Sequence, residues 1–153
     1  LALFTGVRIG ELCALQWGKF SLKEQTIRID ATLQRLRDTS AVGSARTRIV
    51  ISTPKSDTSV RTIPVTDYTA ELCGKMNPHS SAAYVLTGTD SFMEPRALQY
   101  RMEKYTRKCG LEGVHFHTLR HTFATRAVEV GFEIKSLSEV LGHSPACGQA
   151  ASG

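Results

Sequence analysis

The sequence predicts an α+β domain that is mainly α-helical and carries a small three-stranded antiparallel sheet. Three observations lead to this fold class. Residues 26–36 alternate between apolar and polar side chains with a period of two, which is typical of a half-buried strand. Residues 48–52 and 60–65 read as two further strands, with a polar, turn-forming segment between them. The second half of the chain instead places apolar residues at helical spacing, bounded by Pro and Gly.

The first residues of the chain read as the last turn of a helix whose beginning is missing, and Gly6 breaks that helix. A short helix with apolar positions from Ile9 to Leu15 follows, and it carries Arg8 at its first turn. Glu11 lies three residues after Arg8. At this spacing its carboxylate can hold the guanidinium, although a solvated helix charge explains the residue equally well.

The strands at 26–36, 48–52 and 60–65 are expected to form one antiparallel sheet. The turn between the last two strands then carries Lys55 at the tip of a hairpin. Residues 37–47 are expected to be an exposed loop.

Four helices are predicted for the rest of the chain: 67–76, 95–108, 118–130 and 133–141. Pro95 opens the second helix, and Gly142 ends the last one. Val128 and Ile134 are assigned to the buried faces of the last two helices. The helix at 95–108 is rich in cations that either contact a nucleic-acid backbone or are solvated: Arg96, Arg101, Lys104, Arg107 and Lys108.

Length and composition limit the classes of function. The 153 residues suffice for about one domain, and 41% of them are hydrophobic, which allows a buried core. A net charge of +5 favours an anionic partner, but the excess is modest.

No apolar stretch approaches a membrane span and no signal peptide opens the chain, so a cytoplasmic protein without a membrane partner is expected. The four cysteines are scattered, which suggests neither disulfides nor a thiolate metal site.

A small set of cationic and titratable residues suits phosphodiester chemistry. Arg8 and Arg120 can each grip two phosphate oxygens, and paired arginines offset the charge that builds on a pentacoordinate phosphorus. His117 and His143 can donate hydrogen bonds or shuttle protons near neutral pH, and Lys55 adds another cation. His117 and Arg120 lie three residues apart at the start of a predicted helix, where unpaired amides also favour anions.

The same region offers a weaker alternative. His115, His117 and His121 could form a zinc site. Arg120 lies within this cluster and would repel a cation, and no nearby carboxylate or cysteine completes the ligand set. No metal site is therefore assigned.

These residues resemble the tyrosine recombinase (phage integrase) family, whose motifs occur here in the same order. The first arginine box resembles Thr5 to Leu12, and the His-x-x-Arg box resembles His117 to Arg120. The third box resembles Leu141-Gly142-His143-Ser144. Lys55, within Thr53-Pro54-Lys55-Ser56, resembles the family's mobile hairpin lysine. The segment Arg61-Thr62-Ile63-Pro64 follows it in the sequence. The Thr-Pro-Lys and Arg-Thr-Ile-Pro segments are similar to those of integrases of phages and conjugative transposons. The resemblance implies the catalytic-core fold of the family.

The resemblance implies a role for each residue. Arg8 and Arg120 bind the scissile phosphate, His117 and His143 donate to it or shuttle protons, and Lys55 protonates the leaving 5′ oxygen. Glu11 and His121 support this site. The resemblance further implies double-stranded DNA as the partner, contact of the cationic helix with DNA, tetramers on paired sites in the full-length protein, and no metal or nucleotide cofactor.

The resemblance covers residues 1–145 and ends before the family's nucleophile. A tyrosine normally follows the Leu-Gly-His box by about nine residues, but all four tyrosines of this chain lie before His117. Residues 1–145 are therefore expected to be a catalytic domain that lacks its first helix and its tyrosine helix. Residues 146–153 are expected to be a truncated or non-native tail, and the chain to be inactive as it stands. A non-catalytic DNA-binding remnant and a type IB topoisomerase-like domain remain alternatives.

Overall fold

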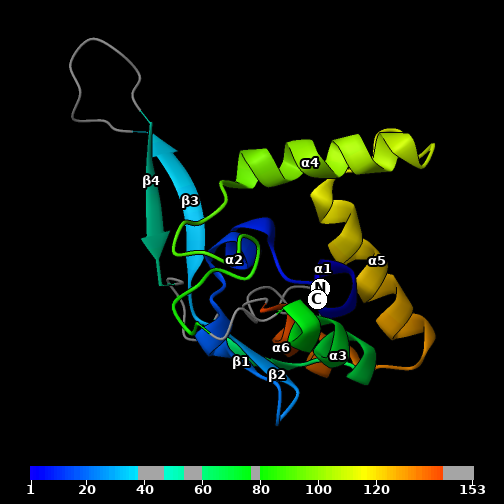
Figure 1. Ribbon diagram of the computed structural model, residues 1–153. Coiled ribbons are helices and arrows are strands. Elements are labelled where there is room, and N and C mark those ends of the chain that lie inside the picture. Colours follow the sequence, from blue (N-terminus) through cyan, green and yellow to red (C-terminus); the bar gives the residue numbers. More distant parts are fainter. Residues whose placement is uncertain (38–46, 54–59, 77–79, 143–153) are drawn as a thin grey trace, which may run out of the picture.

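The computed structural model describes residues 1–37, 47–53, 60–76 and 80–142. The N-terminal part contains α1 (Ala2–Thr5), α2 (Ile9–Ala14), a 3₁₀ turn η1 (Trp17–Lys19) and β1 (Phe20–Ser21). The remaining strands are β2 (Thr26–Ile29), β3 (Thr32–Arg37), β4 (Thr47–Ser52) and β5 (Arg61–Pro64). The other helices are α3 (Asp67–Met76), α4 (Pro95–Lys108), α5 (Phe116–Glu129) and α6 (Ile134–Leu141). An α+β domain with mainly helical content is therefore confirmed (Figure 1).

The described strands form two sheets rather than one. The three-stranded sheet has the order β1-β2-β5, with both pairings antiparallel and Ile27 opposite Ile63. β3 and β4 form a separate antiparallel ribbon with Leu33 opposite Ile51. This ribbon extends away from the helices in Figure 1. The small three-stranded antiparallel sheet exists, but the predicted set of strands in it was wrong.

The predicted strand at 26–36 is interrupted at Asp30 and Ala31. The Asp30 carboxylate accepts a hydrogen bond from Lys19 Nζ at 2.6 Å, and at this point the chain leaves the first sheet. Ile27 and Ile29 pack into the main core with Ile63. Beyond the break, Leu33 packs into a second cluster with residues of α2. The alternation of apolar and polar side chains in residues 26–36 continues across the break, because β2 and β3 each bury one face in their own sheet.

The expected hairpin between 48–52 and 60–65 is also wrong in its pairing. β4 pairs with β3, whereas β5 pairs with β2. The third strand of the sheet is β1, a two-residue segment too short to give a periodic signal. Lys55 lies outside the described residues.

The helices follow the predicted pattern closely, except at two apolar positions. The bounds of α3 and α4 match the prediction, α5 begins two residues earlier, and α6 begins one residue later. Val128 and Ile134 were assigned to buried faces, but they are 53% and 75% exposed. Leu137 and Leu141 already supply the buried side of the short α6, and Ile134 lies at its first residue, outside the packed side.

Gly6 lies where α1, α5 and α6 pack closely together. It ends α1 with a positive φ of 64°, a conformation that glycine adopts without steric cost. A Cβ atom at this position would lie 2.6 Å from Phe123 Cδ1 of α5 and 2.8 Å from Leu141 Cδ2 of α6. The close approach of α1, α5 and α6 at Gly6 brings residues that are distant in the sequence to one place.

Among the residues that the structure describes, no helix has both the length and the apolar character needed to cross a bilayer.

Candidate phosphate-binding site

Glu11 holds Arg8 through the first turn of α2. Arg8 is the N-cap residue of this helix, and its backbone N–H donates to Glu11 Oε2 at 2.8 Å. The Arg8 Nη1 group donates to Glu11 Oε1 at 2.9 Å. This is the contact that the spacing of the two residues predicted. The Glu11 side chain is only 3% exposed, whereas the Arg8 side chain is 40% exposed. Arg8 is thus anchored inside the protein and remains accessible to solvent.

Arg61, for which the sequence predicted no role, is a second partner of Glu11. Arg61 is the first residue of β5, and its Nη1 and Nη2 groups donate to the two oxygens of Glu11, each at 2.9 Å. Both side chains are buried. One signal could have revealed the pair: Arg61 lies two residues before Ile63, so both point to the buried face of the same strand. A charged residue on such a face needs an ionic partner.

Arg120 approaches the same place from α5. Its side chain is buried, and the residue is only 5% exposed. Nη1 donates to the Gly6 carbonyl and Nη2 to the Leu141 carbonyl, both at 2.7 Å. Burial and the charge of Arg8 lower the pKa of Arg120 to about 10; Arg61 adds to this effect and Glu11 opposes it. The guanidinium is therefore charged at neutral pH.

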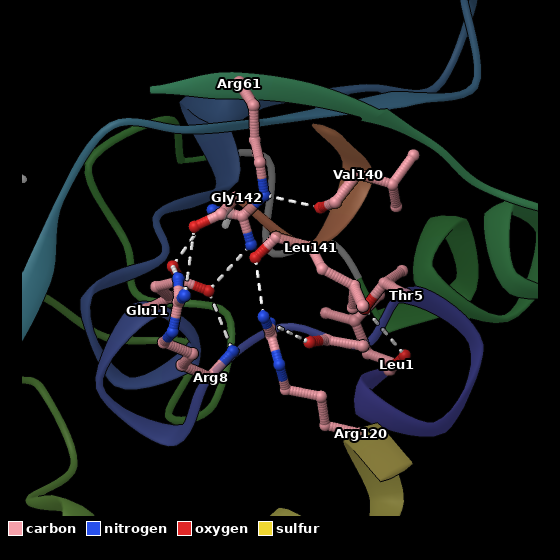
Figure 2. Close-up of polar contacts among 10 residues, drawn as sticks. Leu1, Thr5, Arg8, Glu11, Arg61, Arg120, Val140, Leu141 and Gly142 are labelled. Carbon is pink, nitrogen blue, oxygen red and sulfur yellow. Dashed lines mark hydrogen bonds and ion pairs between the residues drawn. The ribbon is translucent and has the colours of Figure 1, made fainter. Parts of the chain in front are cut away.

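The three arginines converge on the last turn of α6 (Figure 2). Three successive carbonyls at this helix end accept hydrogen bonds, each from a different arginine. The Val140 carbonyl accepts from Arg61 Nε at 2.6 Å, and the Gly142 carbonyl accepts from Arg8 Nη2 at 3.0 Å. The Leu141 carbonyl is the partner of Arg120. Carbonyls in the last turn of a helix lack partners within the helix and form its negative end, so cations stabilise them.

The charges of this cluster do not cancel. Among the residues that the structure describes, the three guanidinium groups face a single carboxylate, that of Glu11, so positive charge exceeds negative charge in this part of the site. Burial opposes the ionised form of Glu11, but the hydrogen bonds and charge of Arg61 and the bonds from Arg8 outweigh it. The pKa of Glu11 is therefore lowered from 4.5. The excess charge beside an accessible Arg8 suits an anion with several oxygens.

The structure leaves His117 at the surface. His117 lies in the first turn of α5 and is exposed, and its ring packs edge-on against His121 with 4.5 Å between the ring centroids. Within the described part of the chain, no hydrogen bond joins His117 to the arginines. His143 and Lys55 lie outside the described residues, although His143 follows Gly142 directly in the sequence.

The five cations expected on the helix at 95–108 are all exposed on α4, together with Tyr100 and Tyr105. Arg96 also lines a groove that runs from Arg8 between β3 and the start of α4. The opposite wall of this groove carries Arg35, which forms an ion pair with Glu94 at 2.5 Å. Of the five cations of α4, Arg96 therefore shares a groove with Arg8.

The histidines weighed as zinc ligands lie at the N-cap of α5 (His115) and within α5 (His117 and His121). No group of three or more His, Cys, Asp or Glu side chains in the described ranges is arranged to hold a metal ion.

The buried Glu11 carboxylate thus holds two arginines, one of which, Arg8, remains accessible to solvent. The chain belongs to the phage integrase family, whose sequence profile matches residues 1–146.

Two curated relatives extend over nearly the whole chain. A tyrosine recombinase from Pseudothermotoga lettingae is 32% identical over 94% of this chain and 43% of its own length. A XerC-like tyrosine recombinase from Caldanaerobacter subterraneus subsp. tengcongensis is 24% identical over 94% of this chain and 41% of its own length. The chain therefore spans less than half the length of these relatives.

Solved structures share the fold. The Tn1549 transposon integrase, determined in complex with circular intermediate DNA, has a TM-score of 0.68 and 26% identity over 94% of this chain and 49% of its own. XerA recombinase has a TM-score of 0.69 and 22% identity over 93% of this chain and 45% of its own. The predicted catalytic-core fold is confirmed by these similarities.

Proposed function

We propose that residues 1–145 are part of the catalytic domain of a site-specific DNA recombinase. The cluster of three arginines around Glu11 carries this proposal, because its excess positive charge beside an accessible Arg8 fits a phosphodiester. Membership of the phage integrase family supports double-stranded DNA as the substrate, as does the similarity to an integrase solved with DNA.

In the proposed reaction, Arg8 and Arg120 stabilise the charge on the non-bridging oxygens of the scissile phosphate. His117 and His143 donate to the phosphate or shuttle protons, and Lys55 protonates the leaving 5′ oxygen. A tyrosine attacks phosphorus and forms a 3′-phosphotyrosyl bond, which a second DNA strand later resolves. The bond energy is conserved in this intermediate, so the reaction needs neither a metal ion nor a nucleotide cofactor.

This chain has no tyrosine after Tyr105, so we propose that it does not cleave DNA by itself. The full-length protein would act as a tetramer on paired DNA sites. Lambda integrase, which shares the fold with a TM-score of 0.55, was solved as a tetramer bound to a Holliday junction.

The chain is expected to bind duplex DNA weakly and without sequence preference, with an affinity that falls steeply with salt. Three or four neutralised phosphates would lower the affinity by about 40- to 150-fold between about 50 and 200 mM salt. Fluorescence anisotropy of labelled duplexes at several salt concentrations measures this dependence. Replacing both Arg101 and Lys104 by Gln should reduce the slope of log affinity against log salt by about two.

Lys75→Gln is the matched control for this change, because Lys75 is exposed on α3 and pairs there with Glu71. Its slope should equal that of the parent. Absence of binding at low salt, or binding that salt does not weaken, would contradict the proposed DNA partner.

The chemistry is tested by covalent capture. The residues after Ser144 are replaced by a helix that carries a tyrosine near position 152, with a phenylalanine version as the control. Both proteins are incubated with a pool of nicked duplexes of randomised sequence, so the recombination site need not be known. Denaturing electrophoresis should detect a protein–DNA adduct only with the tyrosine. DNA binding without an adduct would instead support the DNA-binding remnant.

A further inference from the structure

We infer that Arg61 is a positioning residue of the phosphate site, which holds Arg8 in place through Glu11 and through the last turn of α6. This inference rests on the proposed function for the identity of the anion, whereas the geometry itself involves only residues of this chain. Arg61 is buried and reaches the site from β5, so it acts through its partners rather than on the phosphate.

The first link passes through Glu11. Each oxygen of this carboxylate accepts one hydrogen bond from Arg61 and one from Arg8. Oε1 binds the Nη1 groups of both arginines, and Oε2 binds Arg61 Nη2 and the Arg8 backbone N–H. A bidentate guanidinium fixes both the position and the plane of a carboxylate. Without Arg61, Glu11 could rotate, and the Arg8 guanidinium would lose its fixed partner.

The second link passes through α6. Arg61 Nε donates to the Val140 carbonyl, and its guanidinium also packs closely against Gly142. A Cβ atom on Gly142 would lie 2.9 Å from Arg61 Nη1 and 3.1 Å from its Cζ. The turn that Arg61 supports includes the Gly142 carbonyl, the other hydrogen-bond partner of the Arg8 side chain. Arg61 therefore secures both anchors of the Arg8 guanidinium.

This arrangement needs an arginine. The two Nη groups bind the carboxylate while Nε binds a carbonyl on another element, which uses the planar fork of a guanidinium. A lysine keeps the positive charge but offers one ammonium group, which cannot span these partners. Arg61→Lys thus separates the positioning role from the charge.

The first test follows the Arg8 side chain without DNA. NMR of the full chain labelled with ¹⁵N-arginine measures rotation of each guanidinium about its Nε–Cζ bond, and the spectrum of Arg8→Met assigns the Arg8 signal. We expect rotation of Arg8 to be at least about tenfold faster in Arg61→Lys, since losing a charge-assisted hydrogen bond has an effect of this size. Unchanged rotation of Arg8 would overturn the inference.

The second test measures affinity for a labelled duplex at low salt. Arg61→Lys should weaken binding by about as much as Arg8→Met, roughly tenfold. The double variant should bind no more weakly than either single variant, because both changes remove the same contact. The matched control is Arg28→Lys on β2, an exposed arginine beside Asp30, which should bind like the parent. Additive losses in the double variant would overturn the inference.

A purely structural role would give a different result. Arg61→Lys would then unfold at a lower urea concentration, while its folded form kept slow Arg8 rotation and parental DNA affinity. If Arg61→Lys does not fold, Arg61→Met provides a second route, because methionine fills much of the same buried volume but has no donors for Glu11 or Val140. This variant should also accelerate Arg8 rotation. A parent chain that binds no DNA would count against the proposed function, and the NMR measurement would still decide the role of Arg61.

Discussion

Replacing Glu11 by Gln is expected to lower the free energy of unfolding by about 3–5 kcal/mol, the range for removing one partner of a buried ion pair. Glu11 contacts both Arg8 and Arg61, and Arg120 adds a third positive charge nearby. The amide of Gln has nearly the same shape, so the loss reports the charge rather than packing. Urea denaturation followed by circular dichroism measures the change.

Glu71→Gln is the matched control for Glu11→Gln. Glu71 lies on α3 and forms an exposed ion pair with Lys75, a type of contact that contributes little to stability. Its unfolding curve should nearly coincide with that of the parent. Equal stability of Glu11→Gln and the parent would show that the carboxylate does not offset the arginine charges.

The same carboxylate should make stability depend on pH. The pKa of Glu11 is lower in the folded protein than its ordinary value of 4.5, so the stabilisation is complete above that value. It is lost as the pH falls through the folded-state pKa, because the unfolded chain binds the proton more readily. The parent should therefore lose more stability than Glu11→Gln as the pH is lowered below 4.5.

Sequence reasoning recovered the contacts that lie within one element. Glu11 could be assigned to Arg8 because residues three apart on a helix lie side by side, whatever the rest of the fold does. Helix ends at Gly6 and Gly142 could be predicted for a similar reason, since a positive φ at a helix end favours glycine. These signals depend only on neighbouring residues.

Contacts between elements could not be obtained in this way. The Arg61–Glu11 pair requires β5 to lie beside β2, and the alternating pattern of 26–36 does not specify which strand pairs with which. The contacts of Arg120 with Gly6 and Leu141 span 114 and 21 residues and arise from the packing of α1, α5 and α6. The residue types and the family resemblance predicted a phosphate site, but not the helix end on which the three arginines converge.

The final prediction concerns Arg120 in the chain that carries the grafted tyrosine. Arg120→Ala should lower the rate of covalent DNA capture by about 10²–10³-fold, the effect of removing one preorganised donor from a developing oxyanion. Hydrogen bonds to the Gly6 and Leu141 carbonyls hold this guanidinium before any substrate arrives. Its pKa of about 10 keeps it charged at neutral pH, so the loss should not depend on pH in the neutral range.

Three further variants separate catalysis from folding. Arg120→Met fills more of the buried volume than alanine and should show the same loss of capture, provided that circular dichroism confirms a folded protein. Arg120→Lys keeps the charge but not the planar fork, so its capture rate should lie between those of the parent and the alanine variant. Arg126→Ala is the matched control, because Arg126 lies on the same helix but is exposed and pairs with Glu129. If the folded Arg120→Met protein captures DNA as fast as the Arg126→Ala control, Arg120 does not stabilise the reacting phosphate, and the arginine cluster is a structural support of α6 alone.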